Sequence, residues 1–242
     1  MRLQAVRRTL LYFSFLLFPI TFIYFSPYLA VDGTREGVVS AGLITWLAVT
    51  VSAVIVNRGF CGWACPLGGL QEALPAALGK PLRQPKWGRA SKYTIWAMWV
   101  GSIAVIASMV GGYRKVDIWF HNPGFPPYSD LAHYAFLFFV LLTAIPALFL
   151  GRRAFCHYLC FFSPLNILGS RLGYALRLPM LRVRVVEQSK CTQCKRCNRE
   201  CPMSLDVSGM VARGAVKNRE CIACGNCSAV CPAGTLGYGF GR

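Results

Sequence analysis

The most regular feature of the chain is a series of four long apolar segments, separated by short stretches that hold most of the charges. The segments cover residues 10–30, 38–56, 93–112 and 131–150, and none of them contains Asp, Glu, Lys or Arg. Each is long enough to cross the hydrocarbon core of a bilayer as a helix. One such segment alone would suit a buried helix of a soluble protein equally well, but four in one chain predict a membrane domain.

The basic residues predict the orientation of these helices, because cytoplasmic loops carry an excess of Lys and Arg. Most of them lie before the first segment, between the second and third, or after the fourth. The pattern places both termini in the cytoplasm, as expected for the inner membrane of a prokaryote. The first segment is long and lacks a clear cleavage site, so we expect an anchor and not a cleaved signal peptide or a twin-arginine signal. The basic residues are Arg2, Arg7, Arg8, Arg58, Lys80, Arg83, Lys86, Arg89, Lys92, Arg152 and Arg153.

The pattern changes near residue 180, where basic and apolar residues alternate over 182–185, as in a strand. We therefore expect a membrane domain at 1–180 and an α+β domain at 181–242. The apolar stretches 67–78 and 164–178 are too short or too charged to span and are expected to be interfacial or re-entrant helices. The aromatic loop 113–130 is expected at the outer interface, as a belt or, alternatively, as a docking surface or quinone mouth.

Four of the twelve cysteines belong to an internal repeat with an offset of 95 residues. Segment 58–65 matches 153–160, and residues 70–71 match 165–166. Each motif follows a segment that returns to the cytoplasm, so the membrane domain consists of two tandem two-helix repeats, whose shared interface is the expected functional site. Thiols at i and i+4 share one face of a helical turn, and two facing pairs give the four thiolates of an iron–sulfur cluster. We expect such a cluster, [4Fe–4S] or [2Fe–2S], on Cys61, Cys65, Cys156 and Cys160. The alternative is packing cysteines or redox-active thiols.

The other eight cysteines form two quartets with the spacing C-x2-C-x2-C-x3-C, each followed by proline, 30 residues apart. About the last 55 residues thus resemble a bacterial ferredoxin with two [4Fe–4S] clusters. Structural zinc seldom uses such a run, and disulfides do not suit a reducing compartment. The resemblance implies that three cysteines of one quartet and the fourth of the other hold each cluster. The implied sets are Cys191, Cys194, Cys197 and Cys231, and Cys221, Cys224, Cys227 and Cys201.

Over nearly its whole length the chain resembles the NapH family of quinol dehydrogenase membrane subunits, and also the membrane parts of NosR-type and CcoG-type proteins. The resemblance rests on the F-C-x3-C-P and F-C-x3-C motifs at 60–66 and 155–160, the four apolar segments and the two quartets. The family proline after the second motif is replaced by Phe161, and Pro164 follows three residues later. The flavin-binding region of NosR-type proteins and the additional domains of CcoG-type proteins are missing, so NapH-like is the closest fit.

Several other features of the sequence argue against particular cofactors. His121, His133 and His157 do not form pairs across membrane helices, so we expect no haem. His157 is expected to be an interfacial residue, and the alternative is that it tunes or ligates the cluster on the motif cysteines. No Gly-rich dinucleotide motif follows a strand, which argues against nicotinamide and flavin sites. The lack of charges within the segments argues against ion pumping. Four aromatic residues suit either a quinone pocket or ordinary packing: Trp46, Trp96, Trp99 and Phe136.

The chain is strongly basic, with 26 Lys and Arg against nine Asp and Glu and a net charge of +17. This excess suits anionic lipid or an acidic soluble electron carrier, while the lack of base-stacking aromatics in the ferredoxin part argues against nucleic acid. The expected basic face comprises Lys190, Lys195, Arg196, Arg199, Arg213, Lys217 and Arg219.

We therefore expect a membrane all-α four-helix bundle followed by a two-cluster ferredoxin domain. Its expected function is electron transfer between the quinone pool and a redox partner through three clusters, as one subunit of a larger oxidoreductase complex. The alternatives are an electron-donating assembly factor for a metal centre and a redox-sensing membrane protein.

Overall fold

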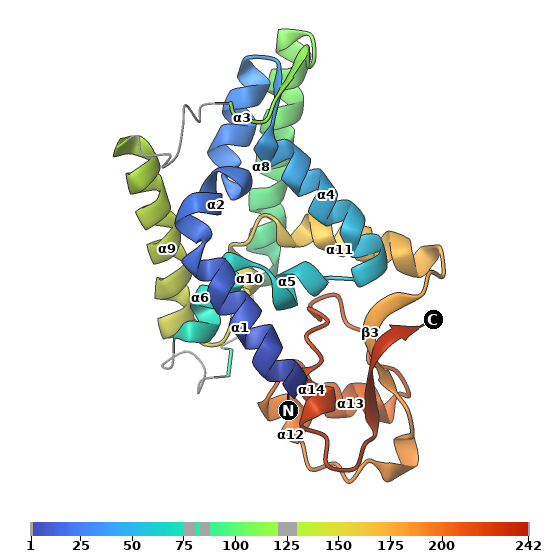
Figure 1. Cartoon of the computed structure of the whole chain (residues 1–242). Coiled ribbons are helices and arrows are strands. Elements are labelled where there is room, and N and C mark those ends of the chain that lie inside the picture. The colour runs from blue at the N-terminus through green and yellow to red at the C-terminus, as the bar shows by residue number, and fades with distance from the viewer. Residues whose placement is uncertain (1, 75–80, 83–87, 121–129, 242) are drawn as a thin grey trace.

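The computed structural model describes residues 2–74, 81–82, 88–120 and 130–241. A helical part is followed by a small C-terminal domain, and both chain ends lie on the side of the molecule that carries this domain (Figure 1). The elements of the helical part are α1 (Arg2–Leu16), α2 (Phe18–Phe25), α3 (Pro27–Arg35), β1 (Val38–Ser40), α4 (Ala41–Val56), α5 (Gly59–Trp63), α6 (Pro66–Ala73), α8 (Gly88–Val110), β2 (Lys115–Asp117), α9 (Asp130–Leu150), α10 (Ala154–Tyr158) and α11 (Ser163–Ala175).

The first expected span is divided among three helices. The chain bends by 67° where α1 gives way to α2 and α3. Pro19 lies just after this bend, and proline cannot donate the backbone hydrogen bond that would continue a helix. Pro27 occupies the first turn of α3, where the missing N–H costs nothing, and Ser26 caps that helix by accepting from Leu29 N.

The other expected spans differ in how well they match single helices. Helix α8 contains an apolar stretch, Ala90–Val110, that is long enough to cross a membrane. Helix α4, with 16 residues, is shorter and is bent by 96° against the following α5 and α6, and the apolar helix Tyr134–Leu150 within α9 is also shorter than the stretch in α8. By length and apolarity, the described residues thus hold one spanning helix, or three if each bent pair counts as one. Half of the aromatic loop 113–130, residues 121–129, lies outside the described residues.

The internal repeat is visible in the backbone. In both copies a long helix leads into a five-residue helix that carries the first motif cysteine, α4 into α5 and α9 into α10. The amide N–H of the second cysteine closes each turn: Cys65 donates to Phe60 O at 3.0 Å, and Cys160 donates to Phe155 O at 2.9 Å. The copies then diverge, since α6 starts directly after Cys65, whereas α11 starts only at Ser163. The missing proline therefore lengthens this connection by two residues.

The short helices after each motif pack across the repeats. Helix α6 lies against α1 and α9, and α11 lies along α4. The approach of α11 to α4 requires glycine, because a Cβ on Gly169 or Gly173 would lie 2.3 or 2.1 Å from the carbonyl oxygens of Thr50 and Val54. Strands β1 and β2, which follow α3 and α8, pair in parallel at the end of the molecule opposite the C-terminal domain.

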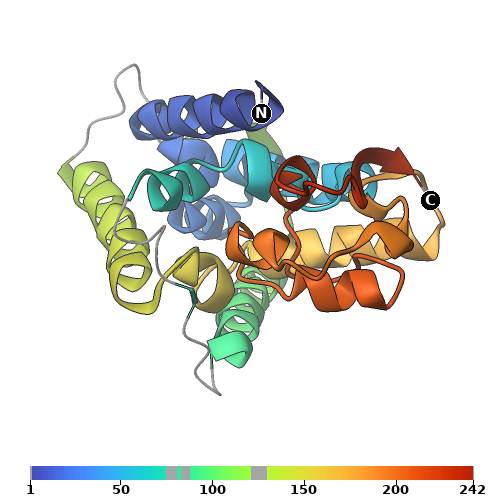
Figure 2. The same cartoon turned by 90° about the horizontal axis from the view of Figure 1, so that it is seen from below.

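The C-terminal domain is built around one antiparallel pair of strands. Strand β3 (Met180–Val185) pairs with β4 (Leu236–Gly241), so that the two ends of the domain meet. Seen from below, the domain lies next to α4 and α11 and away from α9 (Figure 2). Between the strands lie η1 (Gln188–Lys190), α12 (Arg196–Arg199), α13 (Val207–Ala212) and α14 (Asn226–Ala229).

Candidate iron–sulfur electron-transfer site

The C-terminal domain contains two hollows of about 370 Å³ each, and four cysteines line each of them. The groups are the ones that the ferredoxin resemblance implies, each with three cysteines of one quartet and the last of the other. The first hollow is lined by Cys191, Cys194, Cys197 and Cys231, and the second by Cys201, Cys221, Cys224 and Cys227.

The local backbone explains this arrangement. A short helix, α12 or α14, carries the third cysteine of each quartet, and the residue before it, Lys195 or Gly225, has a positive φ that turns the chain around the hollow. At the second hollow this residue has to be glycine, because a Cβ would lie 2.9 Å from the ring of Tyr238. The two quartets thus form similar loops in one small domain.

The hollows suit a multi-atom cluster. Within the described ranges, no three His, Cys, Asp or Glu side chains converge closely enough to hold a single metal ion. Burial raises the pKa of Cys201 to about 12 and of Cys221 to about 11. As free thiols these groups hold their protons at neutral pH, so binding of iron, which requires thiolates, would displace protons. Four soft sulfur ligands around each space fit an iron–sulfur cluster.

The four cysteines of the internal repeat also come together. Cys61 and Cys156 are both 7% exposed and belong to one apolar cluster with Cys201, Cys224 and Cys227 of the C-terminal domain. Cys65 and Cys160 are partly buried and line a separate cavity among aromatic rings. Burial, and after it the nearby Cys156, Cys61 and Cys65, raise the pKa of the Cys160 thiol well above its usual value.

The first motif packs directly on the second quartet. A Cβ on Gly62 would lie 2.4 Å from the carbonyl oxygen of Ile222, so only glycine permits this contact. Trp63 Nε1 donates to Ala223 O at 3.2 Å and to the hydroxyl of Tyr238 at 3.0 Å. Gln4, at the start of α1, donates to Cys224 O at 3.0 Å. The first motif therefore lies in direct contact with the chain that lines the second hollow.

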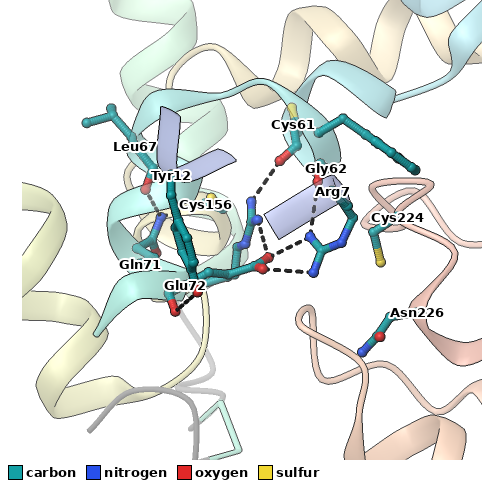
Figure 3. Close-up of polar contacts among 12 residues, drawn as sticks. Arg7, Tyr12, Cys61, Gly62, Leu67, Gln71, Glu72, Cys156, Cys224 and Asn226 are labelled. Carbon is teal, nitrogen blue, oxygen red and sulfur yellow. Dashed lines mark hydrogen bonds and ion pairs between the residues drawn. The ribbon is translucent and has the colours of Figure 1, made fainter. Parts of the chain in front are cut away.

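A buried ion-pair network, the Glu72 network, lies beside the first motif (Figure 3). Arg7 binds both carboxylate oxygens of Glu72, at 2.9 and 2.8 Å, and Arg153 binds Oε1 at 2.5 Å. The same two arginines donate to the carbonyl oxygens of Gly62 and Cys61. The network thus joins α1, α6 and the second repeat to the backbone of the first motif.

A second buried network, the Glu220 network, lies beside the second quartet. Glu220 directly precedes Cys221 and binds Arg58 at 3.1 Å and Lys92 at 2.5 Å. Burial alone would raise the pKa of Glu220, but the charges of Arg58 and Lys92 outweigh it and hold this pKa below its usual value. Arg58 also donates to Arg219 O and to the hydroxyl of Ser163. This network fastens the C-terminal domain to the helical part.

The two networks are equivalent in the repeat and together carry excess positive charge. Arg58 and Arg153 differ by the repeat offset. Each binds a carboxylate that also binds a second cation, which comes from α1 or α8. Four buried cations face two carboxylates, which leaves two positive charges beside the motif cysteines. Burial lowers the pKa of the adjacent His157 to about 4, so it adds no charge at neutral pH. A cluster with four thiolates, which carries about two negative charges when oxidised, would compensate this excess.

The sequence pattern does not reveal these networks. It indicates only that the four basic residues orient the helices, yet each of them is at most 1% exposed: Arg7, Arg58, Lys92 and Arg153. One signal was available in the repeat itself, because position 72 carries glutamate while the matching position 167 carries isoleucine. An unmatched acid in a chain with so few of them suggests a specific buried partner.

Two family models match the chain. A 4Fe–4S binding domain matches residues 39–89 and 132–173, which include both motifs of the repeat, and a 4Fe–4S dicluster domain matches residues 184–232. The ferredoxin-type protein NapH of Haemophilus influenzae is 26% identical over 201 residues, covering 76% of this chain and 63% of that protein. The chain belongs to the NapH-like family of 4Fe–4S proteins.

Other relatives of this family extend the match. The putative electron transport protein YccM of Escherichia coli K12 is 28% identical over 240 residues, covering 91% of this chain and 62% of YccM. The uncharacterized protein MJ0749 of Methanocaldococcus jannaschii is 28% identical over 202 residues, covering 82% of this chain and 71% of its own length. No solved structure matches the chain. The NapH-like resemblance is thus confirmed, and membership of a ferredoxin-type family supports iron–sulfur electron transfer.

Proposed function

We propose that the chain is a membrane electron-transfer subunit that passes electrons between the quinone pool and a redox partner through three iron–sulfur clusters. The observation that carries this proposal is the contact between the first motif and the second quartet through Gly62. Three sets of four cysteines follow one another: the membrane-edge set, the set around the second hollow, and the set around the first hollow.

The residues around the membrane-edge set have two roles. The motif cysteines would hold a cluster, which supplies the one-electron chemistry. The protein sets its potential through charge and hydrogen bonding: Gln71 Nε2 lies 3.3 Å from Cys156 Sγ and donates to it, and the two networks add positive charge. Both effects favour the reduced, more negative state. They therefore raise the potential of this site and suit it to accept electrons from a quinol.

At the other end of the path, the first hollow opens near a basic groove. The groove has a volume of about 1370 Å³, and Arg8, Arg196 and Arg199 line it together with Cys231. Such a surface favours an acidic partner, whether a soluble carrier or another subunit of the complex, with attraction that weakens in salt. The remaining basic residues suit contact with anionic lipid headgroups.

The location of this subunit follows from the charge distribution and the arrangement of the chain ends. We place the helical part in the prokaryotic inner membrane, with both termini and the ferredoxin domain in the cytoplasm. The helix Ala90–Val110 and the excess of basic residues at the end that carries the ferredoxin domain support this topology.

Iron and sulfide analysis with EPR on the intact protein tests the number of clusters. Three cubes give about twelve iron atoms per chain, two cubes and a [2Fe–2S] cluster give about ten, and about eight would remove the membrane-edge cluster. In a Cys61→Ser, Cys156→Ser double variant the iron content falls to about eight, while the signals of the two ferredoxin cubes remain.

Reduction experiments test the electron donor. Quinol reduces the clusters of the purified protein if the proposal holds. Reduction by a soluble donor without any effect of quinone contradicts it and supports a maturation role.

A further inference from the structure

A cavity of about 480 Å³ lies within the helical part, and aromatic rings from both repeats form most of its wall. Phe18 and Phe22 come from α2, Trp46 from α4, and Phe139 from α9. We infer that this cavity binds the ring of a quinone. This inference rests on the proposed function and adds to it the place where the quinone meets the protein.

The shape and chemistry of the wall favour a flat, apolar ring. Its aromatic side chains contact one another both edge to face, as Phe18 and Phe22 do at 5.6 Å between ring centres, and face to face, as Trp46 and Phe161 do at 4.8 Å, and a further aromatic ring can pack on such faces and edges. Phe22 and Phe139 meet at 5.8 Å on the side of α9. Polar atoms contribute almost nothing to the wall. Ligand sites of this type combine a mostly apolar lining with a few polar groups that fix orientation.

One polar group in the wall lacks a partner. Trp46 is 4% exposed, and its indole Nε1 has no hydrogen-bond partner among the described residues. The Trp46 ring is fixed by Trp99 at 4.5 Å and by Phe162 at 4.5 Å, so it cannot turn away without repacking. A buried donor without an acceptor is destabilising, so this N–H favours a ligand that can accept from it. A quinone carbonyl would supply the acceptor, whereas a lipid chain would not.

The cavity also reaches the redox site. Cys65 and Cys160, the second cysteines of the two motifs, are part of its wall. A ring bound there would lie against ligands of the proposed membrane-edge cluster, so electron transfer would need no further carrier. Of the aromatic residues expected from the sequence, Trp46 lines the cavity, while Trp99 and Phe136 pack behind it, and Trp96 is not part of the wall.

Filling the cavity tests the inference. Phe139→Trp adds bulk to the wall, and Phe149→Trp makes the same change at an exposed position of the same helix. With decylubiquinol or menadiol as donor, we expect Phe139→Trp to slow reduction of the clusters at least about tenfold, and Phe149→Trp to have no effect. Iron content and reduction by dithionite stay unchanged in both. Loss of iron in Phe139→Trp would assign the cavity to the cluster and overturn the inference.

A second variant tests the donor. Trp46→Phe keeps an aromatic ring but removes the indole N–H, and we expect it to weaken binding of decylubiquinone about tenfold, because one hydrogen bond is lost. Photolabelling with an azidoquinone, followed by peptide mapping, should mark segments 18–25 or 155–162 and be lost in Phe139→Trp. If quinol fails to reduce the wild-type protein, the proposed function itself is wrong. If it reduces wild type and both variants at equal rates, or the label lies elsewhere, only the cavity assignment is wrong.

Discussion

The Glu72 network and the Glu220 network occupy equivalent places in the two repeats but take their carboxylates from different sources. In both, an arginine that precedes the cysteine motif is joined by a second cation from a longer helix. Glu72 belongs to the first repeat itself, in α6. The matching position in the second repeat holds the buried Ile167, and the acid comes instead from Glu220 of the ferredoxin domain.

This difference shows how a duplicated unit can acquire a fixed partner domain. Glu72 of the first repeat binds Arg153 of the second repeat as well as Arg7, and so joins the two repeats to each other. The second repeat has no acid at the position of Glu72 to face Arg58 of the first repeat and Lys92, and Glu220 of the ferredoxin domain takes this place. Buried ion pairs are weak evidence for stability but give orientation, because removing one partner leaves an uncompensated charge.

The largest effect is expected from Glu72→Gln. Arg7 and Arg153 would both remain buried without a carboxylate, and an arginine cannot release its proton to relieve this. We expect the free energy of unfolding to fall by about 3–5 kcal/mol and the contact between α1 and α6 to loosen. Thermal unfolding of the intact protein in detergent measures this change. The control is Asp117→Asn, which breaks the exposed pair with Lys115 and should leave the unfolding temperature nearly unchanged, because solvent screens this pair. Equal effects of the two variants would show that the Glu72 network is not tightly buried.

Glu220→Gln is expected to cost less and to act elsewhere. Lys92 is the weaker of the two partners, because a buried lysine can release its proton and so limit the penalty, whereas Arg58 cannot. We expect the free energy of unfolding to fall by about 2–3 kcal/mol, which is at or below the low end of the range for a broken buried ion pair. Limited proteolysis should then cut segment 176–179, before β3, while the helical part keeps its unfolding temperature. A fall in that temperature as large as in Glu72→Gln would contradict the division of roles.

Gly62→Ala tests the close contact that the first motif makes and the second does not. The new methyl group would meet Ile222 O, whereas the matching position in the second repeat already carries the large side chain of His157. Overpacking of this kind costs about 1–3 kcal/mol, and the second quartet should shift. EPR of the second cube and spin coupling to the membrane-edge cluster would report the shift. Gly101→Ala in α8 is the control, since no described atom lies within 4 Å of the added methyl, and a gain of up to about 1 kcal/mol is expected there.

The sequence was sufficient for the parts of the site that depend on spacing. The spacing of the quartets predicted which cysteines line each hollow, because spacing along a short loop fixes position. That these cysteines and the four of the repeat hold clusters stays a prediction. The ion pairs could not be predicted, since Arg58 and Glu220 are 162 residues apart and a basic residue near a membrane helix has the same appearance whether it faces lipid or a buried acid. The broken first span was missed for another reason: Pro19 and Pro27 were present, but hydropathy alone does not distinguish a straight helix from three short ones.

Trp63→Phe is expected to have the smallest effect on stability among the variants that change contacts between the helical part and the ferredoxin domain. The change removes the indole N–H that donates to Ala223 O and to the Tyr238 hydroxyl, but it keeps an aromatic ring near Tyr238. Ala223 O still accepts from the Tyr238 hydroxyl at 2.7 Å. We expect a cost of about 0.5–1.5 kcal/mol, measured as faster hydrogen exchange at residues 221–225. Trp99→Phe is the matched control, because it removes one hydrogen bond to Pro27 O within the helical part and should leave that exchange unchanged. If Trp63→Phe released the ferredoxin domain as fully as Glu220→Gln, the docking would depend on this surface contact and not on the buried carboxylate that the second repeat lacks.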